Sequence, residues 1–128
     1  MFLRALALFL SLPALAFAEG PWDGLQTAAN PAHTPVITAP DTVAAGEAFD
    51  VTVALGAKPH PSETTHFIRF IALYAGDVEI ARATLTPVLS QPTVTFRVKL
   101  ERDTTLRALA APNHSAAWVT EKAVKVGH

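Results

Sequence analysis

The 128-residue chain contains no cysteine. A disulfide framework is therefore excluded, and so is any reaction or metal site that needs a thiolate from the chain itself. Methionine and tyrosine occur once each and tryptophan twice. A small domain of this composition has to derive its stability from side-chain packing or from a bound metal.

Charge is also scarce. Charged residues make up 16% of the chain, the formal net charge at pH 7 is −1, and basic residues do not cluster. Nucleic-acid-binding proteins need dense lysine and arginine to neutralise phosphates. We therefore expect no nucleic-acid partner.

The first 18 residues have the order of a secretory signal peptide. One early positive charge, Arg4, precedes an apolar stretch over Ala5–Phe17 and the small-x-small sequence Ala16-Phe17-Ala18. The apolar stretch is short for a bilayer crossing and lacks stop-transfer flanks, so a retained membrane anchor is the less favoured alternative. We expect cleavage near Ala18–Glu19 and a periplasmic or secreted mature protein of about 110 residues with no membrane partner.

Residues 19–32 are rich in turn pairs such as Asn30-Pro31 and predict an irregular arm, followed by a single domain over residues 33–128. From there the apolar period is two, which is typical of strands. Seven stretches rich in Val, Ile, Thr and Phe are expected to be strands: Thr34–Ala39, Phe49–Leu55, His66–Tyr74, Val78–Leu85, Thr93–Leu100, Thr104–Ala110 and Ala117–Val126. The pattern predicts an all-β fold, an immunoglobulin-like antiparallel β-sandwich of about seven strands.

The alternation is clearest over residues 93–100. Val94, Phe96, Val98 and Leu100 alternate with polar residues and are expected to face the core. The sequences Tyr74-Ala75-Gly76-Asp77 and Leu100-Glu101-Arg102-Asp103 predict two hairpin turns.

Five histidines are the main source of chemistry in the chain. A neutral imidazole is the commonest protein ligand for zinc, copper and iron. His60 and His66 are an even six residues apart and would leave an extended chain on the same side, although Pro59 and Pro61 make His60 a turn residue. An ordinary role as polar turn and strand-end residues is the alternative for both.

His33 stands at the entry to the first predicted strand, and His114 lies in the loop before the last. Because strand ends of a sandwich gather at two poles, such loops can converge although they are distant in sequence. His128 is the last residue and is expected to fray.

Several segments together resemble one known family. They are His33-Thr34-Pro35-Val36-Ile37, the run from His60-Pro61 through Glu63 to His66-Phe67-Ile68, Leu106-Arg107-Ala108-Leu109, Trp118 and Glu121-Lys122. They resemble the superoxide reductases, specifically the ferrous-iron domain of the desulfoferrodoxin and neelaredoxin family. The resemblance covers nearly all of residues 33–126.

The resemblance implies an immunoglobulin-like sandwich with one mononuclear iron, four equatorial histidines, an axial cysteine and an open position for superoxide. It suggests His33, His60, His66 and His114 as the metal ligands. The family's His-Pro-x4-His element matches fully at His60 and His66, whereas its Glu-Lys-His-x-Pro element matches only at His33 and Pro35.

Three departures place the activity in doubt. In the family's Cys-Asn-x-His-Gly-x-Trp element, Pro112 takes the cysteine position and Ser115 the histidine position, with His114 one residue early. The lysine that would attract superoxide is replaced by Ala32, and the glutamate before it by Pro31. A nitrogen-only ligand set would also suit copper or zinc.

Three functions follow as hypotheses. The first is a superoxide reductase-like oxidoreductase that converts superoxide to hydrogen peroxide with electrons from a donor protein. The second is a non-catalytic copper- or zinc-binding protein that uses the same rings. The third is a metal-free interaction module, because the segment from His60 to Thr64 also looks like the Z subunit of the thiosulfate-oxidising sulfur carrier. Metal identity, electron donor and oligomeric state stay open.

Two neighbours of the histidines have two interpretations each. Glu63 is either a hydrogen-bond partner for a ligand ring or a solvated turn carboxylate. Trp118 either packs beside the site or is a core aromatic residue. Hydrolytic chemistry is poorly supported, since the serines near histidines lack a Gly-x-Ser-x-Gly elbow.

Overall fold

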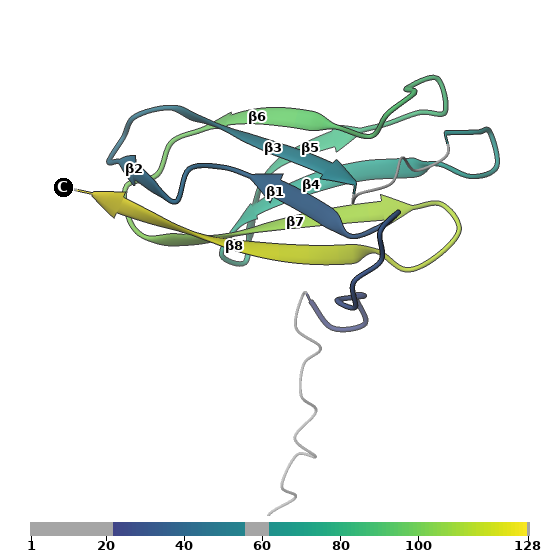
Figure 1. Cartoon of the computed structure of the whole chain (residues 1–128), viewed down its shortest axis with the longest axis horizontal. Helices are drawn as coiled ribbons and strands as arrows, with labels where there is room; N and C mark the ends of the chain where they lie inside the picture. The colour runs from purple at the N-terminus through teal and green to yellow at the C-terminus, as the bar shows by residue number, and fades with distance from the viewer. Residues whose placement is uncertain (1–21, 56–61, 128) are drawn as a thin grey trace, which may run out of the picture.

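The computed structural model describes residues 22–55 and 62–127 and consists of two packed β-sheets (Figure 1). The expected signal peptide, His60 and His128 lie outside the described residues. The strands are β1 (Pro35–Thr38), β2 (Thr42–Ala44), β3 (Phe49–Leu55), β4 (Ile68–Ala75), β5 (Val78–Thr84), β6 (Val94–Val98), β7 (Thr104–Pro112) and β8 (Trp118–Gly127). Within these residues no helix is long and apolar enough to cross a membrane.

The predicted all-β sandwich is confirmed. One sheet has the order β1-β3-β6 and the other the order β2-β8-β7-β4-β5. Among the described residues, the one strand that the sequence analysis did not predict is the three-residue β2, which pairs in parallel with β8 while the other pairs are antiparallel. A three-residue stretch is too short to produce a recognisable alternation.

The core lies between the two sheets, where alternate residues of each strand point inward. Val51 and Val53 of β3 are fully buried against Ile71 and Leu73 of β4 and Leu106 of β7 in one cluster. In β6, Val94, Phe96 and Val98 pack in or against this cluster, and the polar residues between them are exposed. The period of two therefore placed the core correctly.

Only one of the two predicted hairpins forms. The turn after β4 joins β4 to β5, and Gly76, with φ of 60°, takes the left-handed conformation that this two-residue loop requires. The turn at Leu100–Asp103 does not make a hairpin, because β6 pairs with β3 whereas β7 pairs with β4 and β8. The chain changes sheets there, and turn chemistry does not reveal which sheet the next strand joins.

The pairing of β7 decides which loops are neighbours. Ile68 at the start of β4 lies opposite Pro112 at the end of β7, and Ala110 lies opposite Trp118 at the start of β8. The segments before β1 and β4 and between β7 and β8 consequently lie at one end of the sandwich, shown at the right of Figure 1. We call this end the histidine pole, because it carries His33, His66 and His114.

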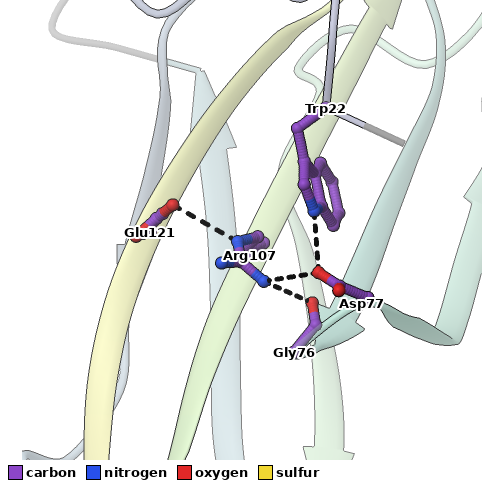
Figure 2. A network of polar contacts seen from close by, with 5 residues as sticks. All are labelled: Trp22, Gly76, Asp77, Arg107 and Glu121. Atoms are coloured by element: carbon purple, nitrogen blue, oxygen red, sulfur yellow. Dashed lines mark hydrogen bonds and ion pairs between the residues drawn. The ribbon is translucent and has the colours of Figure 1, made fainter. Parts of the chain in front are cut away.

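Residues 22–34 form an arm of turns across the outer face of the five-stranded sheet. The Trp22 ring packs edge-on against Tyr74, with centroids 4.7 Å apart, and its Nε1 donates to Asp77 Oδ1 at 2.8 Å. Figure 2 shows that Arg107 completes this network: it donates to Gly76 O and Asp77 and pairs with Glu121, with its guanidinium 5.0 Å from the Trp22 ring centre. The arm is thus anchored at its start by Trp22, whose ring packs over the Arg107 guanidinium.

The arm is attached again beside the histidine pole. Gln26 forms a parallel bridge with Trp118: its N–H donates to Ala117 O and its carbonyl accepts from Val119 N. The Gln26 side chain also donates to Ala116 O at 2.8 Å. These bonds extend the sheet by one residue beyond β8 and direct the chain toward His33.

Replacing Trp22 with alanine should release the arm while leaving the sandwich folded. The lost aromatic and cation–π contacts are together worth about 1–2 kcal/mol. The hydrogen-bonded amides of Gln26, His33 and Thr34 should then exchange with deuterium roughly 5- to 30-fold faster. Trp22→Phe, which loses the bond to Asp77 but keeps an aromatic ring, should show a smaller effect. Equal acceleration in the core strands would contradict this local anchoring.

Candidate metal centre

Three histidine rings meet at the histidine pole. His33, His66 and His114 each offer a ring nitrogen, and these three nitrogens lie within 4.8 Å of one another. His33 Nε2 is 3.4 Å from His114 Nε2. The His66 and His114 rings are stacked, with centroids 3.8 Å apart and planes 16° apart. Three loops that are remote in sequence therefore present their rings to a common point.

His33 is placed by a tight turn and by an aromatic surface. Its N–H donates to Asn30 O at 3.1 Å, which closes the turn just before β1. Its ring stacks on Trp118, with centroids 4.5 Å apart and planes 23° apart. Trp118 is 6% exposed, so it is a core aromatic residue that also packs beside the histidines. Both interpretations of Trp118 hold.

His66 is positioned by a backbone β-bridge to Glu63 in the same segment. Glu63 N–H donates to His66 O, and His66 N–H donates to Glu63 O, at 3.0 and 3.1 Å. The backbone of Glu63, an exposed residue, therefore positions the segment that carries His66. The following residue, Phe67, is hydrogen-bonded to the β7–β8 loop.

His114 is placed by Asn113. Asn113 N–H donates to Phe67 O and its side-chain Oδ1 accepts from Phe67 N–H, both at 3.0 Å. This pair of bonds joins the loop after β7 to the segment before β4, and so sets His114 against His66. Sequence analysis did not single out Asn113 for this role; its position within the resembling Cys-Asn-x-His element was the available signal.

The one-residue displacement of His114 does not remove it from the group. Residues 113–117 are irregular, so successive side chains do not alternate between two faces as they would in a strand. Ser115, which occupies the expected histidine position, is exposed and its hydroxyl donates to Ala116 O. The structure thus brings together three of the four candidate ligands, His60 being outside the described residues.

The donor set is composed of imidazoles. Among the described residues the group contains no carboxylate. Partial burial, and secondly the charge of His66, lowers the pKa of His114 below its usual value. A ring with a lowered pKa is neutral at pH 7, which is the form that binds a metal. Nitrogen ligands with bonds of about 2.0–2.1 Å lie roughly 3–4 Å apart around one ion. The three ring nitrogens, within 4.8 Å of one another, are close to that spacing, and the stacked His66 and His114 rings would have to turn to direct both lone pairs at one ion.

The position of the family's cysteine is filled by a buried proline. Pro112 is fully buried at the end of β7, and its carbonyl accepts from Arg69 Nε at 3.4 Å. Ala32 is half-buried and Pro31 is exposed, so residues 31–32 offer neither the lysine nor the glutamate of the resembling element. The histidine group therefore fits a metal, but without a soft anionic donor from Pro112.

Comparison with known proteins identifies the family. The sequence profile described as Desulfoferrodoxin matches residues 25–121. A Methanocaldococcus jannaschii protein provisionally named a superoxide reductase is 38% identical over 96 residues, which cover 72% of this chain and 81% of that protein. Neelaredoxin from Megalodesulfovibrio gigas is 35% identical over 111 residues, covering 72% of this chain and 85% of the relative.

Solved structures agree with the sequence matches. The superoxide reductase (neelaredoxin) from Ignicoccus hospitalis superposes with a TM-score of 0.68 at 37% identity, over 74% of this chain and 81% of that one. The sulfur carrier protein SoxY from Chlorobium limicola has a TM-score of 0.62 at 19% identity, over 81% and 84% of the two chains, and shares the fold alone. Because the profile and the relatives span most of its length, this chain belongs to the desulfoferrodoxin family.

Proposed function

We propose that His33, His66 and His114, together with His60, hold one mononuclear iron ion and that the protein reduces superoxide. The observation that carries the proposal is the convergence of three imidazole nitrogens within 4.8 Å from three separate loops. The family relationship supports iron, and the names of the relatives support superoxide as the substrate. With its expected signal peptide, the protein would act in the periplasm or after secretion.

The reaction needs little from the protein besides a held and accessible metal. Reduction of superoxide to hydrogen peroxide takes one electron and two protons, and an iron ion held by these histidines would supply the electron if an external donor kept it ferrous. Neutral imidazole ligands would leave the positive charge of a bound ion uncompensated, and this charge would attract an anion. His114 is exposed, so a small anion can approach the pole from solvent.

The missing thiolate should limit this activity. A soft anionic ligand stabilises the oxidised iron and increases electron density at the open position. Pro112 cannot provide it, so an imidazole set would leave bound ferrous iron harder to oxidise. The same nitrogen set favours copper and zinc on the Irving–Williams order. Binding of copper or zinc is therefore the second candidate function. The observation that favours it is the absence of an anionic donor at Pro112.

Elemental analysis of protein purified from its native compartment should show one metal ion per chain. Alanine at His33, His66 or His114 should weaken binding by more than about 100-fold, because each change removes a donor. His128→Ala is the matched control, since His128 is the histidine outside the proposed set, and it should bind as the parent does. Absence of stoichiometric metal from the parent protein would contradict the proposal.

Pro112→Cys should supply the thiolate donor that this chain lacks. The ferrous-loaded variant should consume superoxide about tenfold faster than the parent, which corresponds to roughly 1.4 kcal/mol of barrier. Its ferric form should gain a thiolate-to-iron charge-transfer absorption. Pro112→Ser is the matched control, because it makes the same change in backbone and size without sulfur. If the parent protein binds only copper or zinc and consumes no superoxide, the proposed superoxide reduction is contradicted and the second candidate function is supported.

A further inference from the structure

We propose that Asn30 is a positioning residue that holds His33 in one tautomer and directs its Nε2 into the histidine group. The inference rests on the proposed metal site and extends it to a residue outside the ligand set. Asn30 Oδ1 lies 3.1 Å from His33 Nδ1. His33 Nε2, on the opposite side of the ring, lies 3.4 Å from His114 Nε2.

The hydrogen-bond pattern determines which ring nitrogen carries the proton. The same Asn30 oxygen accepts from Ala32 N–H at 3.0 Å. A backbone N–H can only donate, so the side-chain atom facing it must be the carbonyl oxygen and not the amide nitrogen. That oxygen can only accept, so His33 Nδ1 must carry a hydrogen to bond with it. A neutral His33 ring therefore has an unprotonated Nε2, and this lone pair faces the group.

Asn30 is itself held rigidly. Its N–H donates to the Thr34 hydroxyl at 2.6 Å, and its carbonyl accepts from Thr34 N–H at 2.9 Å and from His33 N–H. The Thr34 hydroxyl also contacts Ala28 O at 3.4 Å. Asn30 and Thr34 are both half-buried, which protects these bonds from water. The turn therefore presents the side-chain oxygen of Asn30 at a fixed place.

The His33 ring is constrained from two directions. Trp118 supports one face of the ring by stacking, and Asn30 fixes its edge. A ring that is held by a face and by one nitrogen has a single nitrogen left for a metal. Hydrogen bonds of this kind orient metal-ligating histidines, and their loss typically costs 10- to 100-fold in metal affinity.

The test uses the apo protein and the metal-loaded protein with three variants. Asn30→Ala removes the acceptor, and Asn30→Asp keeps an oxygen in its place. Gln26→Ala is the matched control, because it removes another side-chain bond of the same arm, that to Ala116 O, without touching His33. Circular dichroism establishes that each variant is folded.

The first measurement is the tautomer of His33 in the metal-free protein, from long-range proton–nitrogen correlation spectra of histidine-labelled chain. The parent, Asn30→Asp and Gln26→Ala should show Nδ1–H with a bare Nε2. Asn30→Ala should show a mixture of both tautomers. A parent ring with Nε2–H, an unchanged tautomer in Asn30→Ala, or an Asn30→Asp ring like that of Asn30→Ala would overturn the inference.

The second measurement is affinity for cobalt(II), by competition with a chelator. Asn30→Ala should bind about 10- to 100-fold more weakly than the parent, whereas Asn30→Asp should bind at least as tightly. An equal loss in Gln26→Ala would assign the effect to docking of the arm and overturn the role of Asn30. If the parent binds no cobalt, the proposed function fails, but the tautomer spectra still decide the role of Asn30.

Discussion

The pairing of β7 with both β4 and β8 is the constraint on which the histidine pole depends. It sets the end of β7 beside the start of β4 and the start of β8, so the loops that carry His66 and His114 have to be neighbours. Asn113 then joins these loops by two hydrogen bonds to Phe67. This register is what allows the His66 and His114 rings to stack.

The third ring reaches the pole by a different route. His33 precedes β1, which belongs to the other sheet, and it is delivered by an arm that crosses the five-stranded sheet. The arm is fixed by Trp22 at its first residue and by the Gln26 bridge four residues further on. The group is therefore assembled across both layers of the sandwich, and Trp118 is the residue that connects them, since it belongs to β8 and stacks on His33.

The donor set of the site is defined by the absence of a cysteine as well as by the histidines that are present. In the resembling element a cysteine stands where this chain has Pro112, a buried residue at the end of a strand. The proline ends β7 just before the loop that carries His114, and its side chain offers no donor atom to a metal. The chain thus keeps the fold of the family and a group of three histidines, whereas Pro112 offers no anionic donor beside them.

The sequence alone determined the fold class and most strand positions, because a period of two is a local property that burial of one face imposes on each strand. It also contained the candidate histidines, and the family resemblance selected them. Neither source could place β6 and β7 in different sheets, since a turn of the same composition can join strands of one sheet or of two. The sequence also could not decide the role of His114, which is displaced by one residue from the family pattern. Because residues 113–117 are irregular, its ring still lies in the histidine group. Tertiary structure decided which rings meet and which nitrogen of His33 faces them, because both depend on contacts between residues far apart in the chain.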